Sequence, residues 1–135
     1  MTGPYFLDAN IIMYAMGGDH PLRAPCRDQL ERIKKGELAV VTSTEVLQEL
    51  LHRYLSLKMP GHAEEAFHAT AGLCRKVFPV TLSDLEKAME IIKANSTLNA
   101  RDAVHAAVML NNKIENILST DQHFDAIEGI KRVAP

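Results

Sequence analysis

The chain is predicted to fold as an α/β protein, a three-layer α/β/α sandwich in which helices cover both faces of a central parallel sheet. Two observations support this prediction. Short apolar segments end in polar turn residues, and these segments alternate with helical patterns along the chain. Parallel strands need a connection of helix length, which the helical patterns supply. The 135 residues and 47% apolar composition fit one domain, residues 1–135.

The first half of the chain contains two strand-and-helix units. The apolar segment 5–7 ends at Asp8-Ala9-Asn10, and the apolar segment 38–41 ends at Thr42-Ser43-Thr44. Polar residues at these positions are typical of strand ends and helix caps. Three helices are expected in this half: one begins near Ile11, and the other two span residues 21–35 and 44–57.

The second half continues the alternation. Helices are expected over residues 63–75, 82–94 and 100–110, and strand segments over 77–80, 116–121 and 130–133. Pro79 lacks the N–H group that a central strand donates, so its strand is expected at a sheet edge. The helix over residues 82–94 has the clearest period, with apolar residues at helical spacing: Leu82, Leu85, Ala88, Met89 and Ile92.

Two helices begin with a capping-box pattern. Thr42 is the expected N-cap of one helix, with Glu45 reaching back from the third position, and Ser83 with Glu86 forms the same pattern in the other. Glu45 is therefore assigned a structural role. Residues 103–108 are mostly small, which suits close packing of their helix on the sheet.

Four acidic residues are expected to meet at one end of the sheet. Asp8 and Asp121 each follow an apolar strand, and open parallel sheets bind ligands beyond the carboxyl ends of their strands. Glu49 and Asp102 lie on helices. Crowded carboxylates take up protons or are neutralised by a divalent cation, and Mg²⁺ prefers oxygen ligands. The pattern predicts a metal site suited to phosphoester hydrolysis, with Asp125 as an optional fifth ligand.

Each acid also has a structural interpretation, which the sequence leaves open. Glu49 lies in an apolar stretch where a buried, unpaired carboxylate would be costly, and a partly exposed glutamate is its alternative. It also lies about 10 Å along its helix, so that helix must lean over the site. The other three acids have alternative roles at helix starts. Asp8 or Asn10 is a candidate cap, and Asp102 is a candidate first-turn residue of a helix that begins after Asn99. Asp121 is a candidate cap that competes with Ser119 or Thr120.

Charge gives a weak indication of a nucleic-acid partner. The formal net charge is −2, and it becomes +2 when the four candidate ligands are set aside. Four basic residues gather in one segment, although a solvated helix face is the preferred explanation for them: Arg27, Arg32, Lys34 and Lys35.

Composition also limits location and redox chemistry. No apolar run approaches the ~20 residues of a membrane span, and the N-terminus lacks the basic stretch of a secretory signal. A cytoplasmic protein without membrane association is therefore expected. Cys26 and Cys74 are far apart and are expected to be reduced thiols, with neither zinc nor a disulfide.

Two histidines suggest a different metal protein. Glu49 and His52, and Asp102 and His105, both have the carboxylate-x-x-His spacing that di-metal helix bundles use. Such a bundle would not need three strand-like segments. It predicts mostly helical circular dichroism and sensitivity to His52→Ala and His105→Ala, whereas the α/β protein with a metal site of four acids predicts mixed α/β dichroism and indifference to both changes.

Over nearly its full length the chain resembles the PIN-domain family, especially VapC-type toxins. The resemblance lies in Phe6-Leu7-Asp8-Ala9-Asn10, in Glu49 within its apolar stretch, in Arg101-Asp102-Ala103 and in the segment 118–125. Family members usually have Thr or Ser where this chain has Ala9, so any hydrogen bond from that side chain is missing here.

The resemblance implies a Mg²⁺- or Mn²⁺-dependent endoribonuclease with a sheet ordered 3-2-1-4-5, commonly a homodimer and inhibited by a cognate antitoxin. The acids would activate a water for in-line attack on an RNA phosphate. The implied catalytic and metal-binding residues are Asp8, Glu49, Asp102 and Asp121, with Asn10 and Thr120 in support and Arg101 as a candidate phosphate contact. A non-catalytic PIN-fold module that binds RNA or protein is the alternative, and the intact acidic quartet weighs against it.

Overall fold

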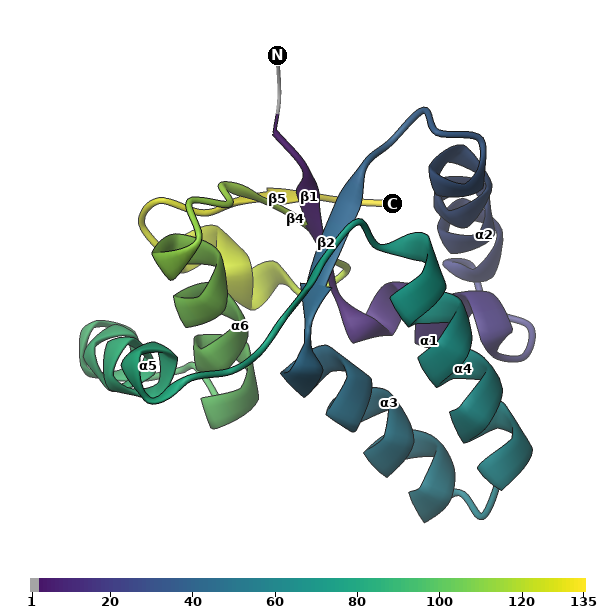
Figure 1. The fold of residues 1–135 in the computed structure, drawn as a ribbon, viewed down its shortest axis with the longest axis horizontal. Helices are drawn as coiled ribbons and strands as arrows, with labels where there is room; N and C mark the ends of the chain where they lie inside the picture. Colours follow the sequence, from purple (N-terminus) through teal and green to yellow (C-terminus); the bar gives the residue numbers. More distant parts are fainter. Residues whose placement is uncertain (1–2) are drawn as a thin grey trace.

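The computed structural model describes residues 3–135 and contains a five-stranded sheet with the order β3-β2-β1-β4-β5 (Figure 1). All four strand pairings are parallel, so the predicted α/β class, strand order and edge position of the Pro79 segment are confirmed. The strands are short: β1 (Tyr5–Leu7), β2 (Val40–Ser43), β3 (Val77–Phe78), β4 (Asn116–Leu118) and β5 (Lys131–Val133).

Six α-helices and one 3₁₀ helix connect the strands. Figure 1 shows α5 and α6 to one side of the strands and α1 to α4 to the other, as expected for a three-layer sandwich. Within residues 3–135 no helix combines the length and apolar character that a membrane crossing requires. The bounds are α1 (Ala9–Met16), α2 (Arg23–Lys34), α3 (Thr44–Ser56), α4 (Pro60–Leu73), α5 (Leu82–Ala94), α6 (Ala100–Asn111) and η1 (Gln122–Ala126).

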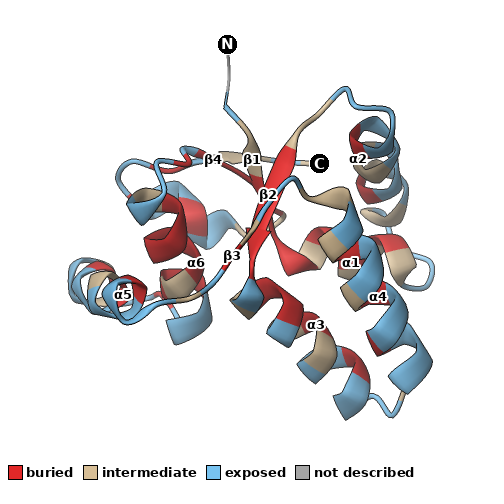
Figure 2. Ribbon diagram, viewed as in Figure 1, coloured by how far each residue is buried: buried red, intermediate tan, exposed pale blue. Residues whose placement is uncertain are grey.

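The core lies on both faces of the central strands, and α6 contributes a largely buried face to it (Figure 2). Phe6 and Ile117 from neighbouring strands are fully buried. Ala103, Ala106 and Ala107 are also fully buried, so the small-residue face of α6 approaches the sheet as the sequence indicated. This close packing holds the N-terminal end of α6 beside the strand ends.

Both predicted capping boxes are wrong in register. Ser43, not Thr42, caps α3 by accepting a hydrogen bond from Val46 N at 3.4 Å. Thr42 is a buried strand residue whose hydroxyl donates to the Leu7 carbonyl at 3.0 Å. At α5 the box is formed by Thr81 and Asp84, two residues before the predicted pair of Ser83 and Glu86.

Three of the five apolar residues at helical spacing on α5 form an exposed apolar stripe. Leu82, Leu85 and Met89 are 74%, 46% and 61% exposed. Ala88, from the same set, lies on the buried face with Asp84, and Ile92 is partly buried against the core. Asp84 accepts hydrogen bonds from Thr81 N and from the Asn111 side chain on α6, and these contacts orient α5 with its apolar stripe outward.

Both cysteines are free, as expected. Cys26 is buried, and burial raises the pKa of its thiol to about 11. Cys74 is half-buried, and burial raises the pKa of its thiol to about 12. Neither thiol is a reactive thiolate at neutral pH.

Asn99→Ala tests the helix start that positions Asp102. The Asn99 side chain accepts a hydrogen bond from Asp102 N at 2.8 Å and caps α6. We expect its loss to lower the free energy of unfolding by about 1 kcal/mol, measured by urea denaturation, because one helix N–H loses its partner. Asn99→Ser should restore most of the loss, and equal destabilisation by both changes would contradict the capping role.

Candidate metal centre

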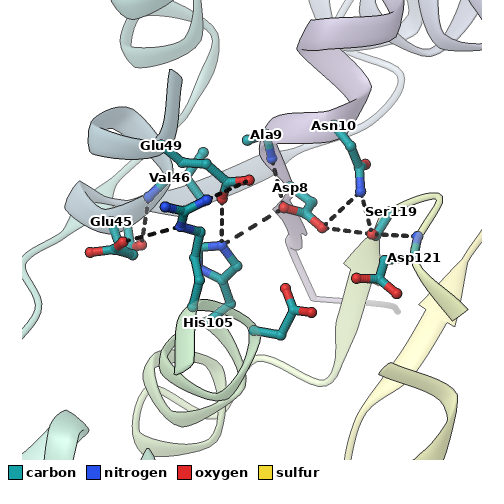
Figure 3. Close-up of polar contacts among 12 residues, drawn as sticks. Asp8, Ala9, Asn10, Glu45, Val46, Glu49, His105, Ser119 and Asp121 are labelled. Atoms are coloured by element: carbon teal, nitrogen blue, oxygen red, sulfur yellow. Dashed lines mark hydrogen bonds and ion pairs between the residues drawn. The ribbon is translucent and has the colours of Figure 1, made fainter. Parts of the chain in front are cut away.

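The structure places all four predicted acids at the carboxyl end of the sheet. Asp8 directly follows β1 and Asp121 lies three residues beyond β4, while Glu49 projects from α3 and Asp102 from the first turn of α6. Figure 3 shows Asp8, Glu49 and Asp121 converging on one region from three different elements. The acids are distant in sequence, and the parallel topology brings them together.

Asp8 is 3% exposed and is held by three donors. Its Oδ1 atom accepts from Ala9 N at 2.7 Å, so Asp8 also caps α1. Its Oδ2 atom accepts from the Ser119 hydroxyl at 2.6 Å and from the Asn10 amide at 3.2 Å. Asp8 can therefore cap α1 and also face the site, because a carboxylate has about four acceptor positions.

Ser119 joins the ends of β1 and β4 and is a residue whose role the sequence did not reveal. Besides donating to Asp8, its hydroxyl accepts from the Asn10 amide at 3.2 Å and from Asp121 N at 3.0 Å. The sequence showed only a polar residue after an apolar strand. Asn10 also accepts from Thr120 N at 3.2 Å, so Thr120 supports this network through its backbone.

Glu49 reaches the centre because α6 provides two partners for it. His105 Nε2 lies 3.1 Å from Glu49 Oε1, and Arg101 Nη1 lies 3.9 Å from Glu49 Oε2. Arg101 also lies 3.7 Å from Glu45, so Glu45 contacts a residue beside the site. The side chain of Glu49 is only 18% exposed. The required lean of α3 over the strand ends is therefore present.

Asp102, Asp121 and His123 form a second group of close side chains. His123 Nδ1 lies 3.0 Å from Asp121 Oδ1 and 4.0 Å from Asp102 Oδ2. Asp121 Oδ1 also accepts from His123 N at 2.9 Å and caps η1, so the predicted cap is present. His123 is more than half exposed, and the group opens to solvent on its side.

Electrostatic crowding shifts the pKa values of two acids upward in the metal-free chain. Burial raises the pKa of Asp8, although His105 and Ser119 partly oppose the shift. Burial, followed by the carboxyls of Asp121 and Asp8, raises the pKa of Asp102 to about 7. A bound cation would oppose both shifts, because it favours the ionised carboxylates.

Asp125, the optional fifth ligand, is engaged elsewhere. Arg132 Nε donates to Asp125 Oδ1 at 2.9 Å, and Arg132 Nη2 donates to Asp125 Oδ2 at 3.1 Å. This two-pronged ion pair holds the pKa of Asp125 below its usual range. Arg132 also donates to the Ser119 carbonyl at 3.3 Å, so the pair ties β5 to the end of β4.

The donor set fits a divalent cation. Two groups, Asp8–Glu49–His105 and Asp102–Asp121–His123, each offer ligand atoms within 4.8 Å of one another. Asp102 Oδ2 is buried and has no hydrogen-bond partner among residues 3–135. An unpartnered carboxylate oxygen beside further carboxylates is costly without a cation, and hard cations prefer such oxygens.

A parallel sheet in this order, with a cluster of acids at its carboxyl edge, defines a class of α/β proteins that can hold a metal ion beyond their strand ends. It excludes the di-metal helix bundle, since the chain contains a five-stranded sheet and His52 is exposed on α3.

The chain belongs to the PIN-domain family, whose model matches residues 5–130. Its relatives include ribonuclease VapC13 from Mycobacterium tuberculosis, which is 40% identical over 128 residues covering 95% of this chain and 98% of the relative. Ribonuclease VapC23 from the same species is 34% identical over 116 residues, covering 86% and 91%. The chain is therefore a PIN-domain protein of the VapC ribonuclease type.

Solved structures show the same fold. Mycobacterium tuberculosis VapC20, a Sarcin-Ricin loop cleaving toxin, superimposes with a TM-score of 0.75 at 23% identity, covering 97% of this chain and 99% of that one. The VapBC2 structure from Rickettsia felis, bound to a promoter DNA fragment, also gives 0.75, at 16% identity and 98% coverage of both chains.

The raised pKa of Asp102 predicts a pH-dependent stability. The carboxyl has a pKa of about 7 when folded and near 4 when unfolded, so the metal-free folded chain binds more protons between these values. Its free energy of unfolding therefore decreases as pH rises through this window.

In EDTA at pH 8 we expect Asp102→Asn to be more stable than the wild type, by on the order of 2 kcal/mol, and the difference to vanish near pH 4. Urea denaturation at both pH values measures this. Asp28→Asn, on the exposed face of α2, should show no such pH-dependent gain. Equal stability of Asp102→Asn and wild type at pH 8 would contradict the assigned pKa.

Proposed function

We propose that the chain is a metal-dependent endoribonuclease, the toxin of a toxin–antitoxin pair, with Mg²⁺ or Mn²⁺ as its cation. The single observation that carries the proposal is the convergence of Asp8, Glu49, Asp102 and Asp121 at the carboxyl edge of the PIN-fold sheet. The ribonuclease names of its relatives support RNA as the substrate.

The four acids would hold the cation. When bound, the cation would activate a water for in-line attack on an RNA phosphate and stabilise charge on the leaving oxygen. Ser119 and Asn10 keep the Asp8 carboxylate oriented, and Asp102 would bind the cation as a carboxylate. No side-chain nucleophile is needed.

Arg101 is our candidate for contact with an RNA phosphate. Its side chain is 43% exposed beside the acidic cluster, and its contacts with Glu45 and Glu49 are long, at 3.7 and 3.9 Å. A guanidinium held this loosely can turn toward a phosphate, which it binds through two N–H groups.

A cognate antitoxin is the partner that we propose besides RNA. Solved structures with the same fold include a toxin–antitoxin complex from Klebsiella pneumoniae, with a TM-score of 0.67, 14% identity and coverage of 94% of this chain and 95% of that one. We further propose that the chain acts in the cytoplasm, where RNA substrate and antitoxin are present together.

RNA cleavage tests the proposed function directly. The purified, antitoxin-free chain should cut a pool of cellular RNA that includes intact ribosomes when Mg²⁺ or Mn²⁺ is added, and EDTA should abolish cutting. Asp8→Asn and Asp102→Asn should each lower the rate at least about 100-fold, because each removes a charged ligand. Asp28→Asn changes the charge equally at an exposed site on α2 and should cut normally.

Two outcomes would contradict the nuclease proposal. Cutting that persists in EDTA or in both active-site variants would place the chemistry elsewhere or in a contaminant. No cutting by the folded chain with either cation would favour a non-catalytic PIN-fold module that binds RNA or protein.

We also propose that the chain forms a homodimer through the exposed apolar stripe of α5. Leu82, Leu85 and Met89 lie at helical spacing on one solvent-facing stripe, which is costly to leave in water. Sedimentation velocity should show a dimer for the wild type and a monomer for the double variant Leu82→Asn/Met89→Asn. Leu55→Asn, at a single exposed leucine on α3, is the control and should remain dimeric. A monomeric wild type would overturn the proposal.

A further inference from the structure

His105 is a fully buried polar residue beside the acidic cluster. It lies on α6, three residues after Asp102, and its Nε2 atom is 3.1 Å from Glu49 Oε1 and 3.9 Å from Asp8 Oδ1. Figure 3 shows the ring beneath Glu49 and Asp8, pointing toward both. The ring also packs near Phe6, with the two ring centroids 5.7 Å apart.

The contact with Glu49 shows how the ring uses its nitrogens. Two acceptors 3.1 Å apart would repel, so Nε2 must carry a hydrogen and donate it to the carboxylate. Nδ1 is buried and has no hydrogen-bond partner among the described residues. A histidine that ligates a metal usually donates its other N–H to a partner, and His105 lacks one. The geometry therefore favours a hydrogen-bond donor over a metal ligand.

Glu49 needs such a donor because of its place in the fold. It extends from the second turn of α3, and a long glutamate side chain loses rotamer entropy when it is held in one position. His105 holds its Oε1 atom by a short contact between the two helices, whereas Arg101 approaches Oε2 only at 3.9 Å. His105 is thus the firm anchor of this carboxylate.

We propose that His105 is a positioning residue, whose Nε2–H holds Glu49 Oε1 so that the carboxylate faces Asp8 and completes the cation site. The proposal rests on the metal-dependent function proposed above. It also revises the expectation that activity is indifferent to both histidines: His52 is exposed on α3, and indifference is expected for it alone.

Mn²⁺ binding without RNA tests this role in three variants. His105→Leu removes the donor and keeps an apolar side chain, and we expect it to weaken Mn²⁺ binding 10- to 100-fold. His105→Gln places an amide N–H near the position of Nε2 and should stay within about fivefold of the wild type. His52→Leu, in the matching x-x-His position on α3, should bind like the wild type. Isothermal titration calorimetry gives the affinities, and thermal unfolding in EDTA checks that each variant is folded.

Pulsed EPR of the Mn²⁺ complex of His123→Ala, which leaves His105 as the histidine in the two acid–histidine groups, should show no strong ¹⁴N coupling to the bound Mn²⁺. Three results would overturn the proposal: unchanged affinity in folded His105→Leu, equal weakening in His105→Leu and His105→Gln, or a directly coordinated ¹⁴N. A wild type that fails to bind Mn²⁺ would overturn it together with the metal site. Normal Mn²⁺ binding without RNA cleavage would overturn the nuclease function and leave the positioning role intact.

Discussion

Mutual repulsion among carboxylates at the carboxyl edge of the sheet is the constraint on which this site depends. Asp8 is almost completely buried and Asp102 nearly so, and each senses a neighbouring acid. Buried like charges are tolerated only with donors, protons or a cation to balance them. The chain supplies backbone and hydroxyl donors to Asp8 and leaves one Asp102 oxygen without a partner. This uneven supply is what a site built for a cation requires.

Helix α6 has two roles in the site. Its small buried face lets it lie close to the sheet, and its first turn, capped by Asn99, brings Asp102 to the strand ends. One turn on, His105 reaches across to Glu49. A single helix thus carries one acid and orients another, so the geometry of the α3 side of the site depends on how α6 packs.

The sequence allowed accurate prediction where local chemistry and topology agree. Asp8 and Asp121 could be placed because apolar strands followed by acids define the carboxyl ends of a parallel sheet, and the resemblance to PIN domains supplied the strand order. Caps were less predictable. Adjacent threonines and serines offer equivalent hydroxyls, and only the backbone conformation selected Ser43 and Thr81 over Thr42 and Ser83. The apolar period of α5 was real but could not show which face meets the core.

The sequence by itself determined the fold class, the order of the elements and the four acids that converge, because these follow from periodicity, strand-end chemistry and family motifs. Tertiary structure alone decided which polar residues contact these acids. Ser119 contacts Asp8 across 111 positions and His105 contacts Glu49 across 56, and Arg132 takes Asp125 away from the site. Such contacts depend on distances between elements, on side-chain direction and on burial, which a linear pattern does not contain.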